Sequence, residues 1–445
     1  MWRATDGQPM ALPKIAYGRG SRLYDVTGKE YIDGSGGPAV YCLGHAHSEV
    51  NDAIKRQLDA VAHAYRYNFA SDPMEQLTEL VARRSGPGFT DMIFTTGGSE
   101  AVESALKVAL HYHHAAGAPT RQRFIARERS WHGNTIGALS VSHFKERRAP
   151  YEGALVPASH VSAVNPYRPP AGVAAADVAA ACADELEREI LRVGADNVAA
   201  FVFEPVVGAA GGAVPAPPGY ARMVRDICDR HGVLMIADEV MCGTGRCGTW
   251  RALEHDGVVP DVMAIAKGLG GGYVPLGATL YHDKVAAVLR AVGGPQTGHT
   301  FTGHTLACAA GLAVQRIVER DGLVERVCAD GPRLMRTIEE RFADVEHVGD
   351  IRGRGFFVGL ELVADPETKQ PFPAAAGLHL LIRRHALDNG LICYPTGGNV
   401  DGVNGDTVII APPFNVTDAE IDEIVDKLDR SVRAALADVT AGAAH

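Results

Sequence analysis

Two stretches indicate the fold of this chain: VLMIADEVMCGTGR at residues 233–246, and DVMAIAKGLGGG at residues 261–272. Each contains five successive apolar residues that end on a charged one, Asp238 in the first stretch and Lys267 in the second. Short apolar runs with turn residues behind them are typical of strands that are buried on both faces of a parallel sheet. We therefore predict two successive strands, one ending in a carboxylate and the next in an ammonium group.

Three earlier apolar runs, at residues 92–95, 124–126 and 199–203, repeat this pattern. A helical pattern over residues 100–112 follows the first run, so that strands and helices alternate along the middle of the chain. Strands connected in this way pair in parallel and are covered by helices on both faces. The pattern predicts an α/β domain built on a mainly parallel sheet.

Four polar or glycine-bearing segments follow these predicted strands. A Gly97-Gly98-Ser99 turn follows the first strand, and Glu204, Asp238 and Lys267 follow later ones. Ligands of open α/β sheets bind beyond the carboxyl ends of the strands. We therefore expect these groups to meet at one site.

Lys267 and Asp238 have an ordinary and a functional interpretation. A lone lysine usually extends its amine to solvent, and a lone aspartate usually caps a helix or pairs with a cation. A lysine at the end of a buried strand can instead be activated by partial desolvation and form a Schiff base. Asp238, 29 positions earlier (267 − 238), would then face a pyridine nitrogen and keep it protonated.

Three further segments are weaker signals. Gly98 and Ser99 would present N–H groups and a helix dipole to a phosphate, although Ser99 also fits a plain helix cap. Trp131, which precedes His132, would stack on a flat ring or pack in the core. Residues 299–304 are polar and precede a helical pattern over 306–317, so they would supply a hydroxyl to a phosphate or only begin that helix.

The two ends of the chain form a different pattern. Residues 20–33 predict a hairpin with its turn at Thr27-Gly28. The carboxyl-terminal part predicts helices at 332–342, 374–389 and 418–436, and strands at 356–363, 391–394 and 407–410. We predict an N-terminal segment, 1–50, that packs with a small α+β domain at 331–445, and a large domain at 51–330. The Pro/Gly-rich stretch at 208–219 is predicted to be a surface connection.

The composition excludes several classes of protein. The formal net charge of −10 is spread along the chain without an acidic tail, which argues against nucleic acid as a partner, because nucleic acid recruits basic surfaces. Cys242 and Cys247 are the one close cysteine pair, and no histidine or cysteine set around them has the spacing of a zinc site. No apolar run reaches the roughly 18 residues that a membrane span needs. The start, MWRATDGQPM, has no apolar core of signal-peptide length. We therefore expect a cytoplasmic protein without metal, membrane or nucleic acid.

The combined motifs resemble a known family. The most specific segment is residues 237–246 with 261–268 downstream, and TGGSEAVE at 96–103 and residues 300–310 add to it. Over nearly its whole length the chain resembles the class III, or ω-, aminotransferases, which are fold type I pyridoxal-phosphate enzymes. The resemblance implies a large domain with a mainly parallel seven-stranded sheet flanked by helices, and a smaller α+β domain made from both termini.

The resemblance also implies roles for individual residues. Lys267 would hold pyridoxal 5′-phosphate as a Schiff base and shuttle the proton, while Asp238 pairs with its pyridine nitrogen. The other implied cofactor contacts are Gly98 and Ser99 at the phosphate, Trp131 and Val240 on the two ring faces, His132 beside them, Glu204 near the phenolic oxygen, and Thr300 at the phosphate of the other subunit. The active sites would therefore lie at the interface of a homodimer or a dimer of dimers. Tyr41, Arg66 and Trp131 are the candidates for the substrate pocket.

Some positions depart from the family pattern. Trp131 stands where the family usually has tyrosine or phenylalanine, and this substitution preserves a stacking role. Ile409 stands where the ornithine-type branch has an arginine for the α-carboxylate, and Asn404 lies near the mobile arginine of some ω-amine branches. The resemblance therefore leaves open which residue binds a substrate carboxylate.

The implied reaction is a ping-pong transfer of an amino group from a primary amine or an ω-amino acid to a keto acid such as pyruvate. A mutase, racemase or decarboxylase of the same fold is an alternative, because these enzymes share the cofactor chemistry. A nucleotide-binding oxidoreductase is disfavoured because the glycines at 270–272 lack the G-x-G-x-x-G spacing. A catalytically inactive binding protein is disfavoured by the intact set of Ser99, Asp238 and Lys267.

Overall fold

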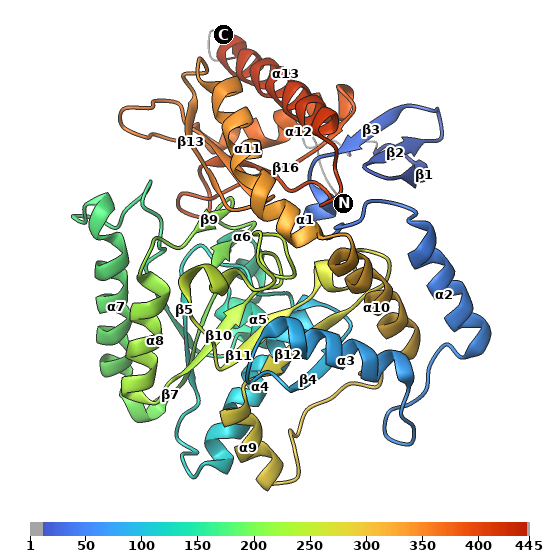
Figure 1. Cartoon of the computed structure of the whole chain (residues 1–445). Helices are drawn as coiled ribbons and strands as arrows, with labels where there is room; N and C mark the ends of the chain where they lie inside the picture. The colour runs from blue at the N-terminus through green and yellow to red at the C-terminus, as the bar shows by residue number, and fades with distance from the viewer. Residues whose placement is uncertain (1–11, 443–445) are drawn as a thin grey trace.

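The computed structural model describes residues 12–442 (Figure 1). The stretch 1–10, in which no targeting segment is expected, lies outside the described residues. In the part of the chain that is described, no helix is both long and apolar enough to cross a membrane.

A seven-stranded sheet forms the centre of the molecule, with the strand order β4-β12-β11-β10-β7-β5-β6. Only β12 runs against its neighbours, so the predicted mainly parallel seven-stranded sheet is confirmed. The strands are β4 (Asp91–Thr95), β5 (Arg123–Arg127), β6 (Ala158–Val161), β7 (Val198–Phe203), β10 (Leu234–Asp238), β11 (Val262–Ile265) and β12 (Gly277–Tyr281).

The inner strands are buried along their whole length because helices cover both faces of the sheet (Figure 1). Alternate residues of β10 point to opposite faces, as the pleat of a strand requires. Ile236 packs in the cluster under α4 (Gly98–Ala115), whereas Met235 packs against α7 (Val178–Val193) and α8 (Tyr220–His231). The continuous apolar runs in the sequence follow from this burial on two sides.

Three further helices pack beside the large sheet. The helix α10 (Thr305–Arg320) lies against α2 (Ser48–Ala60) and α3 (Asp72–Ser85). Leu77 of α3 joins Leu269 in one buried cluster, so this layer also supports the loop that follows Lys267.

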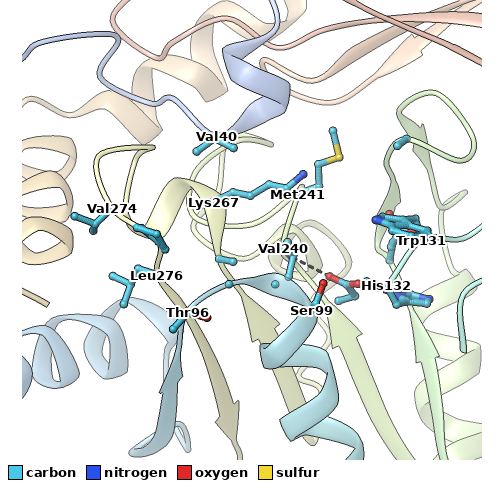
Figure 2. Close-up of a pocket in the computed structure, with 18 residues that line it drawn as sticks. Val40, Thr96, Ser99, Trp131, His132, Val240, Met241, Lys267, Val274 and Leu276 are labelled. Atoms are coloured by element: carbon cyan, nitrogen blue, oxygen red, sulfur yellow. Dashed lines mark hydrogen bonds and ion pairs between the residues drawn. The ribbon is translucent and has the colours of Figure 1, made fainter. Parts of the chain in front are cut away.

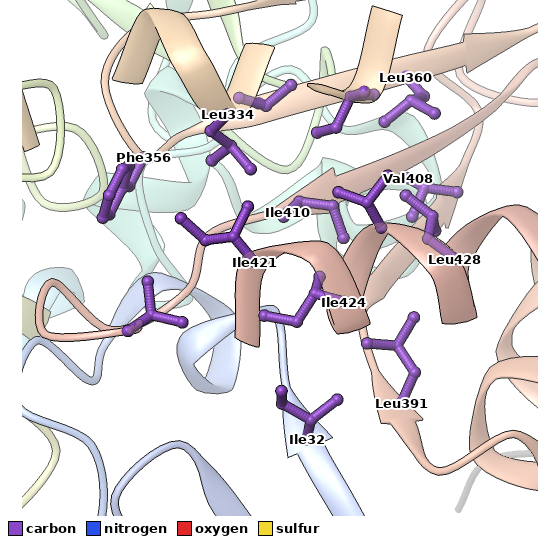
Figure 3. Close-up of a cluster of buried hydrophobic side chains, with 14 of the residues drawn as sticks. Ile32, Leu334, Phe356, Leu360, Leu391, Val408, Ile410, Ile421, Ile424 and Leu428 are labelled. Carbon is purple, nitrogen blue, oxygen red and sulfur yellow. The ribbon is translucent and has the colours of Figure 1, made fainter. Parts of the chain in front are cut away.

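The carboxyl-terminal part contains a second, antiparallel sheet with the order β13-β14-β17-β16. Its strands are β13 (Val348–Gly353), β14 (Val358–Leu362), β16 (Tyr394–Gly397) and β17 (Asp406–Ile410). Its helices are α11 (Leu323–Phe342), α12 (Leu378–Asp388) and α13 (Asp418–Gly442). Figure 3 shows Leu334, Ile410 and Ile424 facing one another in the buried cluster between this sheet and its helices.

The N-terminal segment joins this carboxyl-terminal unit through a small sheet with the order β1-β2-β3-β15. The predicted hairpin is confirmed, since β2 (Arg22–Asp25) and β3 (Glu30–Asp33) pair antiparallel and β1 (Ile15–Arg19) adds a strand at the edge. On its other side β3 pairs in parallel with β15 (Leu391–Ile392). Ile32 therefore lies in the same apolar cluster as Leu391 (Figure 3).

Two local predictions were wrong. The helix predicted from Pro332 begins at Leu323, so that Pro332 lies inside α11 rather than in its first turn. The stretch at 208–219 is not a surface connection, because residues 208–214 are all buried. A short antiparallel pair, β8 (Val206–Val207) with β9 (Val214–Pro215), folds this stretch between the two sheets, where Arg352 of β13 donates to the carbonyls of Gly211 and Gly212.

Candidate active site

A cavity of about 270 Å³ opens beyond the carboxyl ends of β4, β7, β10 and β11. Figure 2 shows the Lys267 side chain reaching into it, with Val240 and Ser99 on the opposite side and Trp131 and His132 at one end. The lining residues are Val40, Thr96, Gly97, Gly98, Ser99, Trp131, His132, Gly133, Glu204, Ala209, Asp238, Val240, Met241, Ala266, Lys267, Val274, Pro275 and Leu276.

Lys267 begins the 3₁₀ turn Lys267–Leu269 directly after β11 and has a positive φ of 45°. The Nζ atom donates to the Pro38 carbonyl oxygen at 3.4 Å. Burial lowers the pKa of the ammonium group to about 8, and the negative charges of Asp238 and Glu204 act in the opposite direction. About a tenth of Lys267 is therefore a neutral amine at pH 7, far more than for a lysine of ordinary pKa.

Asp238 is the last residue of β10, and its side chain is 3% exposed. One carboxylate oxygen accepts the Val240 backbone N–H at 3.0 Å, and the other lies 2.7 Å from His132 Nδ1. The Nε2 atom of His132 is buried and has no hydrogen-bond partner among the described residues. These bonds fix the carboxylate at the floor of the cavity, where it can pair with a cationic group of a ligand.

Glu204 follows β7 and binds two backbone segments at once. Its carboxylate accepts the Trp131 N–H at 3.0 Å and the Gly208 N–H at 2.8 Å. Burial raises the pKa of this carboxyl group, and the charge of Asp238 adds to the effect while His132 opposes it. Glu204 therefore holds the loop that carries Trp131 against the buried stretch that begins at Gly208.

The helix α4 begins at Gly98, on the edge of the cavity. No side chain of the described part of the chain caps the helix at Gly97, so the N–H groups of the first turn and the positive end of the helix dipole are available to an anion. A Cβ atom on Gly98 would lie 2.7 Å from Val240 Cγ1, and only glycine permits this close approach. The Ser99 Oγ accepts the Asn134 N–H at 3.0 Å, which keeps this hydroxyl beside the helix end.

Trp131 forms the boundary of the cavity on the side of the loop after β5. Its ring packs edge-on against Phe144, with the ring centroids 6.0 Å apart. The Arg147 guanidinium lies over the indole, 4.5 Å from the ring centroid. The position of this ring is therefore fixed by two neighbours and by the backbone bond to Glu204.

The cavity brings together eight of the residues selected from the sequence: Gly98, Ser99, Trp131, His132, Glu204, Asp238, Val240 and Lys267. Tyr41, Arg66 and Thr300 do not line it within a single chain. Arg66 and Thr300 are exposed, and Tyr41 packs against Gly37 and Gly272, so that its neighbour Val40 contributes to the lining instead. Their roles stay predictions.

Several residues of the site lie in no sequence motif that would have identified them. Val40 comes from the N-terminal segment, and Val274 and Leu276 follow the glycine-rich turn. Met241 lies in the quoted segment 237–246 but was not singled out. Gln315 of α10 donates to the carbonyls of Gly268 at 2.8 Å and Leu269 at 3.1 Å, which fixes the loop after Lys267. An isolated glutamine in an apolar helix is the only trace of this role in the sequence.

Comparisons with known proteins decide which family this site belongs to. The family model for class III aminotransferases matches residues 4–432. An uncharacterized aminotransferase of Schizosaccharomyces pombe is 41% identical over 96% of this chain and 93% of its own length. A putrescine–pyruvate aminotransferase of Pseudomonas aeruginosa is 32% identical over 95% of this chain and 92% of its own.

The chain belongs to the class III aminotransferases.

A solved structure supports the same assignment. The PLP-bound amine transaminase from an uncultivated Pseudomonas species superimposes with a TM-score of 0.89, at 33% identity and with 95% of both chains covered. Class III aminotransferases depend on pyridoxal 5′-phosphate, so this chain is a pyridoxal-phosphate enzyme of fold type I.

The cavity of this class III aminotransferase fits that cofactor. The Lys267 amine can bond to an aldehyde, and the buried Asp238 carboxylate can face a protonated ring nitrogen. The uncapped first turn of α4 can bind a phosphate, at the point where the missing Cβ of Gly98 leaves room. One cavity therefore offers a group for the aldehyde, the ring nitrogen and the phosphate.

Proposed function

We propose that this aminotransferase moves the amino group of a primary amine or an ω-amino acid to a keto acid such as pyruvate, by a ping-pong mechanism. Transamination itself follows from the family. The choice of substrates rests on relatives, among them the putrescine–pyruvate aminotransferase and a diaminobutyrate–2-oxoglutarate transaminase of Halomonas elongata, which is 35% identical. The observation that carries the proposal is that the Lys267 amine and the Asp238 carboxylate line one cavity.

The bound cofactor supplies an electron sink that weakens the bonds to the substrate carbon. Lys267 would hold the cofactor through its amine, and once a substrate amine has taken its place this amine would move a proton as general base and acid. A pKa near 8 suits this task, because both protonation states of Lys267 are accessible near neutral pH.

The other residues position the cofactor. Asp238, which is held by His132 and the Val240 N–H, would keep the ring nitrogen protonated. Val240 and Trp131, which both line the cavity, would enclose the ring, and Gly98 with Ser99 would bind the phosphate. Glu204 orders the polar side of the pocket through Trp131 and Gly208.

A homodimer, or a dimer of dimers, with active sites at the interface completes the proposal. Thr300 would reach the phosphate bound by the other subunit. In support, Thr300 is exposed, and so is the next residue, Phe301, at 52%. The Phe301 ring contacts His63, which contacts the exposed Tyr65, and Tyr65 stacks on the exposed Tyr67, so these rings form one continuous group at the surface. Large exposed aromatic groups are typical of interaction surfaces.

We also propose the cytoplasm as the location of the enzyme, and a division into the large domain 51–330 and a small domain 331–445 joined by residues 1–50. The pairing of β3 with β15 supports the assignment of the N-terminal segment to the small domain.

Replacement of the lysine tests the proposed chemistry. We expect Lys267→Ala to lose the absorbance of the bound cofactor and to lower turnover by at least roughly 100- to 10,000-fold, the usual contribution of a positioned general base. The control is Lys107→Ala, which removes an exposed lysine from α4 and should retain both properties. Repeated turnover by Lys267→Ala would disprove the proposed role of Lys267.

A further inference from the structure

A second cavity, of about 620 Å³, adjoins the candidate active site. Its lining is mainly apolar and comes from the N-terminal segment, the segment around Phe144, α12 and β16. Two contacts join the cavities. Pro38 lines the second cavity and its carbonyl oxygen lies 3.4 Å from Lys267 Nζ, and Thr396 of the second cavity donates to the Ala209 carbonyl of the first at 3.3 Å.

Arg147 lies where the two cavities meet. It lines the second cavity, and its guanidinium is 4.5 Å from the centroid of the Trp131 ring, which lines the first. The same guanidinium group also lies 4.7 Å from the centroid of the Phe144 ring. Stacking on aromatic rings fixes the plane of a guanidinium group while its edge stays free for hydrogen bonds.

No carboxylate neutralises this guanidinium in the described part of the chain. The next residue, Arg148, is fully engaged, because it pairs with Glu152 and donates to the Ser140 and Ser142 carbonyls. Among residues 12–442, the Arg147 side chain has contacts with the Trp131 and Phe144 rings and no ion pair. A half-buried cation without a partner can gain a charge-assisted bond from a ligand.

The other charged groups of the second cavity are less suited to bind an anion beside Trp131. His379 is bonded to Asp406 at 2.6 Å, and Glu146 is an exposed carboxylate. Arg383 lies on α12, in the wall of the second cavity that the carboxyl-terminal unit forms. Arg147 contacts Trp131, a residue of the active-site cavity.

The two positions at which related branches have a carboxylate-binding arginine, 409 and the region of 404, cannot bind a carboxylate in this chain. Ile409 is fully buried in β17, and its side chain belongs to an apolar cluster. The Asn404 amide donates to Asp401 at 2.7 Å. Neither residue can therefore replace the missing arginine.

We propose that Arg147 binds the carboxylate of the keto-acid acceptor, and of any amino-acid substrate, through paired hydrogen bonds from its guanidinium edge. This inference rests on the proposed function and assigns the carboxylate site within it. The substrate carboxylate would lie over the edge of Trp131, with its reacting carbon toward Lys267. Arginine suits this role because its planar fork matches both oxygens of a carboxylate.

The test compares a keto acid with an uncharged acceptor of similar size in the complete, cofactor-loaded enzyme. For Arg147→Met we expect the ratio of kcat/KM for pyruvate to kcat/KM for propanal to fall roughly 10- to 100-fold, as expected for the loss of charge-assisted hydrogen bonds. Arg147→Lys should restore part of the ratio, since it keeps the charge without the fork. The matched control is Lys145→Met, which removes the same charge from the same short helix outside the cavity and should leave the ratio unchanged.

A second measurement does not depend on turnover. Propionate, a carboxylate without a reactive carbonyl, is titrated against the cofactor absorbance of the wild type and of Arg147→Met. We expect the dissociation constant to rise roughly 10-fold or more in the variant. Equal ratios and equal propionate affinities in the two enzymes would overturn the role of Arg147. Absence of amino transfer in the wild type with every amine would overturn the proposed function, while the propionate titration would still decide the role of Arg147.

Discussion

Lys267 holds its reactive amine in place at an energetic cost. A residue other than glycine with a positive φ usually costs about 1–3 kcal/mol of backbone strain, and such strain is concentrated at functional sites. Burial of the ammonium group adds to this cost, and Asp238 and Glu204 offset it only in part. The packing of Gly268 against Thr244, which also has a positive φ, holds this conformation.

The lowered pKa of Lys267 predicts a pH dependence for cofactor attachment. Only the neutral amine attacks an aldehyde, so the rate at which cofactor-free enzyme binds pyridoxal phosphate covalently should follow the deprotonated fraction. Below pH 8 the rate should fall about tenfold per pH unit, and above the pKa of about 8 it should level off. The measurement is stopped-flow absorbance over a pH series.

A simple alkylamine provides the reference for this profile. Its reaction with the same aldehyde should keep rising towards pH 10.5, the ordinary lysine value. A profile for the enzyme that parallels the alkylamine, with no plateau near pH 8–9, would show that Lys267 is not desolvated.

The site residues at strand ends could be predicted from the sequence, but the residues that contact them could not. Asp238 and Lys267 terminate apolar runs, and the rule that ligands bind beyond the carboxyl ends of strands predicted that they would share a cavity. The bond between Asp238 and His132 joins positions 106 residues apart, and Pro38 lies 229 positions from Lys267. Such contacts are set by the assembled fold and leave no local pattern.

At the scale of elements, α10 stabilises the loop that follows β11. The Gln315 side chain, 2% exposed, donates to two carbonyls of residues 268–269. This loop cannot form a regular ladder, since it turns sharply after Lys267. Gln315 therefore supplies the hydrogen bonds that secondary structure does not.

Replacement of this glutamine should loosen the loop. Gln315→Leu removes the amide that donates to the Gly268 and Leu269 carbonyls, while Gly268 keeps the weak bond from the Cys42 thiol at 3.7 Å. This loss should lower the free energy of unfolding by about 1–3 kcal/mol and speed cofactor release. Urea unfolding and the decay of cofactor absorbance after dilution measure the two effects. The exposed Gln122→Leu serves as control and should change stability by less than about 0.5 kcal/mol. Unchanged cofactor release in a destabilised Gln315→Leu would mean that α10 supports only the fold.

Continuous apolar runs predicted strands well, and mixed segments did not. The strands β4, β5, β7, β10 and β11 could be predicted because a strand that is buried on both faces has a continuous apolar sequence. The strand β12 was missed. Its sequence, GATLY, becomes a strand because it pairs antiparallel with β4 and β11, so Ala278 lies opposite both Phe94 and Ile265. The start of α11 was missed because proline usually favours the first turn of a helix, whereas Pro332 lies within it.

At the scale of the whole molecule, buried arginines join the two sheets around the active site. Arg246, next to the loop after β10, donates to the Pro412 carbonyl at 2.5 Å and to the Tyr41 carbonyl at 3.1 Å. Arg352 of β13 donates to the carbonyls of Gly211 and Gly212. These two residues lie in the buried stretch that begins at Gly208, whose N–H donates to Glu204. The large sheet alone therefore does not complete the cavity, and the N-terminal segment and the carboxyl-terminal unit help to shape it.

The proposed dimer predicts that damaged subunits can complement each other. Lys267→Ala damages the site of its own chain, whereas Thr300→Glu would place a carboxylate against the phosphate bound by the partner. Each variant alone should be inactive. After unfolding and joint refolding in equal amounts, about a quarter of the wild-type activity should return, because half of the dimers are mixed and each mixed dimer keeps one intact site.

The same design separates this arrangement from its alternatives. A mixture of Lys267→Ala with Asp238→Asn is the matched control, and it should recover no activity because both lesions affect groups that line the cavity of one chain. If the Thr300→Glu mixture also recovers none, although light scattering shows that mixed dimers form, Thr300 acts within its own chain or has no role at the phosphate. If each chain behaves as a monomer at the assay concentration and the wild type is still active, the site does not need a partner.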